Sequence, residues 1–200
     1  MGVVTQFHVL TALLVVVTWL GIVTYLRLRR QSSIVYLLFV TLFYAYVIKV
    51  IDYTLFQFQS LLILRHFLPG LLLNGQSAGN SVNLVPLMTL TPADLKTSLL
   101  NILLLVPFGF GLPFLVTWRM KKVVCIGALF SIAIECLQAI TGAVAHMTFR
   151  VADINDVLFN TAGAAIGSML FVGFVRLCRH TADNGERPAN PIVRYLARDR

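Results

Sequence analysis

The chain has 200 residues, 58% of them hydrophobic and 12% charged, and its mean hydropathy is +0.84. Globular proteins are roughly 45–50% apolar, so this composition indicates an integral membrane protein, and one bundle would use the whole length. The formal net charge of +8 does not indicate nucleic-acid binding, because the basic residues form short clusters between apolar runs, where they direct membrane insertion. The three cysteines fall within or at the end of predicted spans, so we expect reduced, packed thiols and no disulfide or zinc framework.

Five apolar runs are long enough to cross a bilayer, which takes roughly 17–25 helical residues. These runs cover residues 7–26, 34–51, 98–118, 123–140 and 157–177. The stretch 61–73 is interrupted by Arg65, His66, Pro69 and Gly70, which leave pieces too short to cross. We therefore expect it to lie in the interface or to dip into the membrane and return. The predicted fold is an all-α transmembrane bundle of about five spans.

The distribution of charge predicts the direction of insertion. Three segments that would lie on the same side of the membrane are basic: Arg27, Arg29 and Arg30; Arg119, Lys121 and Lys122; Arg176 and Arg179. The alternate loops carry little net charge. Because basic loops stay in the cytoplasm, we expect the N-terminus outside and the C-terminus inside. The expected organisation is one bundle over residues 1–179, followed by a basic cytoplasmic tail over residues 180–200.

Polar residues interrupt the outer parts of the last three spans. At 1.5 Å per residue, Glu135 lies about 18 Å and Gln138 about 22 Å along the fourth span from Val123, and a spacing of three places both on one helix face. The fifth span begins on the side of the membrane where the fourth span ends. The residues expected to close an outer-leaflet cleft are Asn101, Glu135, Gln138, Arg150, Asp153, Asp156 and Asn160.

The charges of this predicted cleft do not balance. A carboxylate in hydrocarbon costs about 2.5–3.5 kcal/mol on insertion scales, so Glu135 should face the interior and have a partner, for which Arg150 is the candidate. Three carboxylates against one arginine mean that one carboxyl is protonated or that a cation or cationic ligand group completes the site. Two local alternatives stay open: Asp153 and Asp156 can cap the fifth helix, and Gln138 can be the hydrogen-bond partner of Glu135.

Other patterns predict structure rather than chemistry. Pro92, in the run Thr-Pro-Ala-Asp, is typical of the first residue of a helix. Gly163 and Gly167 form a small-xxx-small pattern that lets neighbouring helices approach closely. Lys49 and Asp52 are three residues apart and are expected to pair. We find no phosphate-binding loop, metal-binding motif or nucleophile motif, and the sequence does not identify a cofactor.

Four blocks of sequence carry a family resemblance. They are Asn83-Leu84-Val85-Pro86, then Asn101-Ile102-Leu103-Leu104-Leu105-Val106-Pro107-Phe108-Gly109-Phe110, then Glu135-Cys136-Leu137-Gln138, then Arg150 with Asp153, Asp156, Asn160 and Gly163. In order and spacing these blocks resemble VanZ-like membrane proteins over roughly residues 34–175. The resemblance implies a small multi-pass protein of the bacterial cytoplasmic membrane. The namesake of that family lowers susceptibility to teicoplanin-type glycopeptide antibiotics.

Three functions are compatible with such a cleft. The first is binding of a lipid or envelope-precursor head group, or of a glycopeptide antibiotic, with a contribution to antibiotic resistance. The second is an enzyme that acts on a lipid-linked envelope substrate by carboxylate acid/base chemistry. The third is a proton-coupled transporter or flippase, which is disfavoured because the inner halves of the fourth and fifth spans lack polar residues. The expected partners are membrane lipids.

Overall fold

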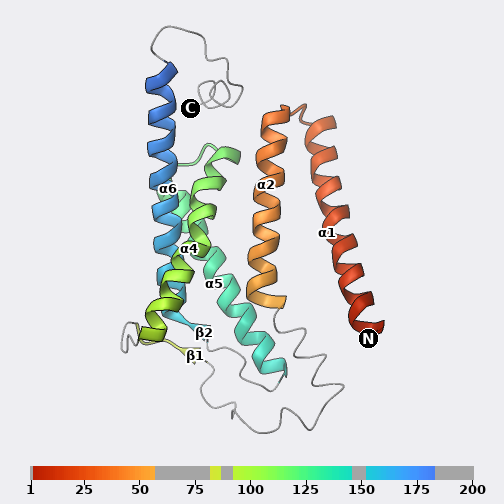
Figure 1. Cartoon of the computed structure of the whole chain (residues 1–200), viewed down its shortest axis with the longest axis vertical. Helices are drawn as coiled ribbons and strands as arrows, with labels where there is room; N and C mark the ends of the chain where they lie inside the picture. The colour runs from red at the N-terminus through yellow and green to blue at the C-terminus, as the bar shows by residue number, and fades with distance from the viewer. Residues whose placement is uncertain (1, 57–81, 87–91, 146–151, 183–200) are drawn as a thin grey trace.

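The computed structural model describes residues 2–56, 82–86, 92–145 and 152–182 (Figure 1). These segments form an all-α bundle, as predicted. The helices are α1 (Gly2–Leu28), α2 (Ile34–Ile51), α4 (Pro92–Leu115), α5 (Met120–Ala145) and α6 (Ile154–Ala182), and α2 continues into a π-helical turn, η1 (Asp52–Phe56). Two short strands, β1 (Val82–Asn83) and β2 (Ala152–Asp153), pair in parallel, with Val82 opposite Ala152.

Five of these helices are long and apolar enough to cross a membrane, which confirms the predicted number of spans within the described part of the chain. The third spanning helix begins at Pro92, as its sequence predicted. The last one runs to Ala182, five residues beyond the predicted end at Leu177. The segment 61–73, expected at the interface, and most of the predicted tail lie outside the described residues.

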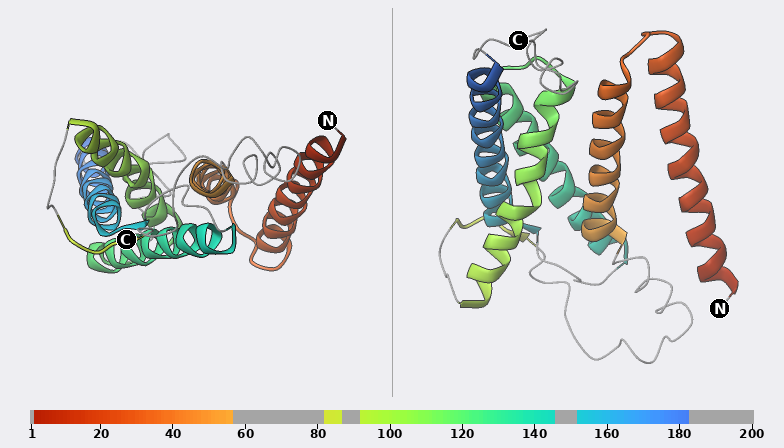
Figure 2. Two further views of the ribbon diagram at one scale, coloured as in Figure 1. Left: turned by 90° about the horizontal axis from the view of Figure 1, so that it is seen from below. Right: turned by 45° about the horizontal axis from the view of Figure 1, so that its top comes forward.

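The helices divide into a packed group and a flank. Figures 1 and 2 show α4, α5 and α6 against one another, α2 beside α4, and α1 at the outer edge beyond α2. No residue of the spanning part of α1, Leu10–Leu28, is buried. α1 is held to α2 by polar contacts: the hydroxyls of Thr18 and Tyr44 are 2.6 Å apart, and Trp19 donates from Nε1 to Thr41 at 3.1 Å. An exposed apolar helix of this kind suits a lipid environment.

Close approach of α4 and α6 fixes the centre of the bundle. A Cβ on Gly163 would overlap the carbonyl oxygen of Ile102, and one on Gly167 would overlap that of Val106. On the opposing helix, a Cβ on Gly109 would overlap the carbonyl oxygen of Ala164. The small-xxx-small pattern therefore brings the third span against the fifth, as predicted.

A proline in α4 leaves a backbone acceptor that α6 satisfies. Pro113 has no N–H, so the carbonyl of Gly109 loses its usual partner four residues later. Ser168 of α6 donates from Oγ to that carbonyl at 3.4 Å and to the carbonyl of Ala164 at 2.8 Å. Backbone acceptors inside a membrane must be satisfied within the protein, so Ser168 contributes to the same close contact.

An aromatic cluster packs the end of the bundle where α4 ends. Phe114 stacks on Phe39 of α2, with ring centroids 4.3 Å apart, and meets Phe171 of α6 edge to face at 4.9 Å. Large rings with these geometries bury much apolar surface and add roughly 0.5–1.5 kcal/mol per pair.

The predicted packing role of the cysteines is wrong for two of them, because Cys125 and Cys136 are exposed on the bundle surface, although all three thiols are free as expected.

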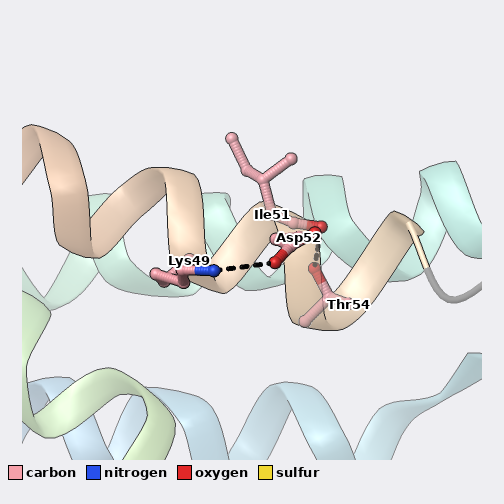
Figure 3. Close-up of polar contacts among 4 residues, drawn as sticks. All are labelled: Lys49, Ile51, Asp52 and Thr54. Atoms are coloured by element: carbon pink, nitrogen blue, oxygen red, sulfur yellow. Dashed lines mark hydrogen bonds and ion pairs between the residues drawn. The ribbon is translucent and has the colours of Figure 1, made fainter. Parts of the chain in front are cut away.

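The predicted pair at the end of α2 is present. Lys49 donates from Nζ to Oδ2 of Asp52 at 3.1 Å, and both side chains are largely exposed (Figure 3). In the following turn Thr54 is buried, and its hydroxyl donates to the carbonyl of Val50 at 2.7 Å. Figure 3 also shows the longer contact of the same hydroxyl with the carbonyl of Ile51, at 3.5 Å. This turn directs the chain toward the polar residues described next.

Candidate functional site

Most of the buried polar side chains gather at one end of the bundle, where α4 and α6 begin and α5 ends (Figure 1). α4 and α6 run in the same direction and α5 runs in the opposite one (Figure 2). We call the following buried residues the polar cluster: Thr54, Ser98, Asn101, Ser131, Glu135, Gln138 and Asn160. They come from η1, α4, α5 and α6, so the cluster depends on the packing of the whole bundle.

Asn160 and Ser131 connect α6 to α5 inside this cluster. Asn160 donates from Nδ2 to Oγ of Ser131 at 2.8 Å, and both side chains are buried. Asn101 is buried on α4, near the start of the contact between α4 and α6. Asn101 precedes Ile102, whose carbonyl oxygen lies against Gly163, three residues after Asn160 on the parallel α6.

Glu135 is tied to the start of α6. Its side chain is 8% exposed, and its Oε2 accepts a hydrogen bond from the backbone N–H of Asp153 at 3.1 Å. Asp153 in turn accepts from the backbone N–H of Asn155 at 2.8 Å and from Nδ2 of Asn83 at 3.1 Å, both at Oδ1. The carboxylate of Asp153 therefore caps the first turn of α6 and holds β1 against β2.

Gln138 extends the cluster toward α2. It donates from Nε2 to the backbone carbonyl of Thr54 at 3.1 Å, and it is only 2% exposed. Thr54 lies in the π-helical turn at the end of α2, where backbone carbonyls lack regular helical partners. The side chain of Gln138 thus supplies a partner for a carbonyl of η1, and this bond fixes the end of α2 beside α5.

Three buried amide atoms have no hydrogen-bond partner within the part of the chain that the structure describes. They are Nδ2 of Asn101, Oε1 of Gln138 and Oδ1 of Asn160. A buried polar group without a partner costs about 1–3 kcal/mol. Native proteins seldom leave such groups unpaired, so each requires an explanation. Here all three belong to the same cluster, one donor and two acceptors on three different helices.

An apolar layer closes the cluster on the side of the bundle centre. Leu105 and Ala164 are fully buried one turn beyond Asn101 and Asn160, and Phe108 packs with them. A Cβ on Gly127, one turn before Ser131 on the antiparallel α5, would overlap the Cβ of Ala164. Among the described residues, the polar cluster is therefore continuous with other polar side chains at one end of the bundle only.

Comparison with known proteins assigns the family. The model of the VanZ/LLP1 family matches residues 53–177. The chain belongs to the VanZ/LLP1 family. No curated protein and no solved structure is significantly similar to it. The VanZ/LLP1 match begins at the π-helical turn and ends within α6, so it contains the entire polar cluster together with Asn83, Asp153 and Asp156.

The structure brings together most of the predicted site residues of this VanZ/LLP1 protein. Asn101, Glu135, Gln138 and Asn160 are buried in the cluster. Asp153 caps α6, which is the local alternative left open for it, and Asp156 lies half-buried in the first turn of the same helix. The predicted partner Arg150 lies outside the described residues. Whether these side chains bind a ligand stays a prediction.

Three contacting residues were missing from the predicted site. Asn83 carries a visible signal, since it opens the first block of the VanZ-like pattern, but no sequence rule pairs it with Asp153. Ser131 lies four residues before Glu135 and so shares its helix face. Thr54 contributes a backbone carbonyl, for which the sequence holds no signal.

Proposed function

We propose that the polar cluster forms a cleft at the outer leaflet that binds a lipid or envelope-precursor head group, and that the protein thereby contributes to resistance to teicoplanin-type glycopeptides. The observation that carries this proposal is the set of three unpartnered amide atoms, each on a side chain at least nine-tenths buried. A hydrogen-bonding head group would satisfy atoms that the described chain leaves unpaired. Membership of the VanZ/LLP1 family supports the resistance role.

The position of the cluster favours binding over transport. A transporter needs polar groups that continue from one side of the membrane to the other or a site that both sides reach in turn. Here the layer of Leu105, Phe108 and Ala164 lies directly beyond the cluster. A head group that enters from the near end would therefore stop at this layer, with its acyl chains still in the lipid.

The charge of the two ends supports the outward placement of the cluster. The exposed cations at the opposite end are Arg27, Arg29, Arg30, Arg119, Lys121, Lys122, Arg176 and Arg179. Basic segments of this kind remain in the cytoplasm. The end that carries Glu135, Asp153 and Asp156 would then face the outside of a bacterial cytoplasmic membrane, where envelope precursors and glycopeptides meet.

The test is to express the chain in a glycopeptide-susceptible bacterium and to measure the inhibitory concentration of teicoplanin. Expression should raise this concentration, and Glu135→Gln should abolish the increase while membrane levels of the protein stay unchanged. Asp52→Asn is the matched control, because it neutralises an exposed carboxyl at the same end but outside the cluster. Full resistance in Glu135→Gln would show that the cluster is not the functional site.

A further inference from the structure

We propose that the end of the bundle opposite the polar cluster binds the head groups of anionic phospholipids. This end comprises the turn between α1 and α2, the turn between α4 and α5, and the last turns of α6 (Figure 1). The inference goes beyond the proposed function, because it concerns the other side of the membrane. The exposed cations that define this basic end are Arg27, Arg29, Arg30, Arg119, Lys121, Lys122, Arg176 and Arg179.

The positive charge of the chain is concentrated at the basic end. Its eight lysines and arginines are accompanied by no aspartate or glutamate among the described residues. Residues 183–200, which follow α6, carry four arginines and three acidic residues, so they add positive charge wherever they lie. The rest of the chain holds four lysines and arginines and five acidic residues. Even if all three acids after α6 paired with cations of the basic end, most of its cations would remain in excess.

Aromatic residues place these cations at the level of the lipid head groups. Nζ of Lys122 lies 4.1 Å from the ring centroid of Trp118, which is itself exposed. Tyr25 is exposed in the last turn of α1, next to Arg27. Tryptophan and tyrosine gather where the hydrocarbon meets the head groups. The cations beside these rings therefore stand among lipid phosphates rather than in bulk water.

The spread of the cations favours a lipid surface over a soluble acidic partner. They belong to α1, α5, α6 and the adjoining turns, from one edge of the bundle to the other (Figure 2). An anionic leaflet presents negative charge along this whole width, whereas a docked protein or nucleic acid would meet only part of it. Basic segments also orient insertion, but their attraction to anionic lipid persists once the helices are in place.

The experiment measures lipid association with the full-length protein in vesicles of phosphatidylcholine. Spin-labelled phosphatidylglycerol or spin-labelled phosphatidylcholine is added in trace amounts, and electron paramagnetic resonance gives the fraction of each whose motion the protein restricts. We expect phosphatidylglycerol to associate about fivefold more strongly, the factor that one charge contact at a membrane surface supplies. The preference should disappear at about 1 M salt, where the Debye length is roughly 3 Å.

Two matched double variants locate the effect. Lys121→Gln with Lys122→Gln removes two exposed lysines of the basic end and should lower the preference to about half. Lys49→Gln with Lys96→Gln removes two exposed lysines of the opposite end and should leave it unchanged. All four side chains are exposed, so both variants should fold, which thermal unfolding checks. Labelled lipid reaches both leaflets, so the result does not depend on how the protein inserts.

The other outcomes would overturn the proposal. Equal association of the two lipids, or a preference that persists at high salt, would show that charge does not attract lipid to the bundle. Equal losses in the two double variants would refute the placement at the basic end. If soluble glycerol phosphate abolishes the preference at constant ionic strength, the cations bind a free phosphate and not a lipid. None of these results bears on the polar cluster, which Glu135→Gln tests separately.

Discussion

The contact of α4 with α6 should tolerate no added methyl group at Gly167. A Cβ at this position would overlap the carbonyl oxygen of Val106 and would come within 2.7 Å of the backbone nitrogen of Phe110. Both obstructing atoms belong to the backbone of α4, so neither can rotate away as a side chain would. Gly167→Ala therefore forces the two helices apart along the whole contact, which also includes Gly163.

Extra methylenes in a packed core cost typically 1–3 kcal/mol. We expect Gly167→Ala to lie in the upper half of that range, about 2–3 kcal/mol, because relief requires movement of a helix. Gly163→Ala should cost a similar amount, since its Cβ would overlap the carbonyl oxygen of Ile102. The double variant should cost less than the sum, because one outward shift of α4 relieves both overlaps and neighbouring sites are not additive.

The same helix supplies the control. Gly173 also lies in α6, and nothing comes within 4 Å of a Cβ built there. Gly173→Ala should leave stability unchanged or raise it by up to about 1 kcal/mol through helix propensity. The assay is thermal unfolding of the purified protein in detergent, where 2–3 kcal/mol corresponds to roughly 4–12 °C for a chain of this size. Equal melting temperatures for Gly167→Ala and Gly173→Ala would refute the packing argument.

Two further predictions concern the polar cluster and its orientation. Ser131→Ala should lower the free energy of unfolding by about 1–3 kcal/mol, because it leaves Nδ2 of Asn160 buried without its acceptor. Thr161→Val, which removes a bond to a carbonyl of its own helix only, should cost less in the same thermal assay, and equal losses would count against the cluster as a stability determinant. The orientation can be tested in a variant with all native cysteines replaced by serine. In that variant Asp52→Cys should react with a membrane-impermeant maleimide in intact cells, and Arg30→Cys should react only after permeabilisation. The reverse pattern would contradict the predicted orientation.

The spans and the relative levels of their polar side chains were predictable because helix geometry leaves little freedom. Once five apolar helices alternate in direction, a rise of 1.5 Å per residue fixes the level of each polar side chain. Glu135 near the end of α5 and Asn160 near the start of α6 had to fall close to one level, and the hydrogen bonds from Asn160 to Ser131 and from Asp153 to Glu135 follow from that placement. Membership of the VanZ/LLP1 family was predictable from the four blocks of sequence that carry the family resemblance.

Lateral partners were less predictable, because the sequence does not state which helix faces which. Glu135 accepts a hydrogen bond from a backbone N–H at the start of α6, which no sequence pattern indicated, and its expected partner Arg150 lies outside the described residues. Gln138 bonds the carbonyl of Thr54, and that acceptor exists because α2 ends in a π-helical turn. A π-helical turn of this kind depends on tertiary contacts. Because every residue has a backbone carbonyl, composition and spacing do not show which carbonyl will be the acceptor.

The extent of the family match separates the bundle into parts with different roles. Every residue of the polar cluster lies within residues 53–177, whereas α1 and nearly all of α2 precede that segment. α1 contacts α2 and has no buried residue in its spanning part, so it contributes nothing to the cluster directly. α2 contributes through its last turn alone, where Thr54 meets Gln138. Ligand binding by the polar cluster should therefore depend on the segment from η1 to α6. The role of α1 is to anchor the bundle in the membrane. Substitutions confined to the contact between α1 and α2 should leave ligand binding intact.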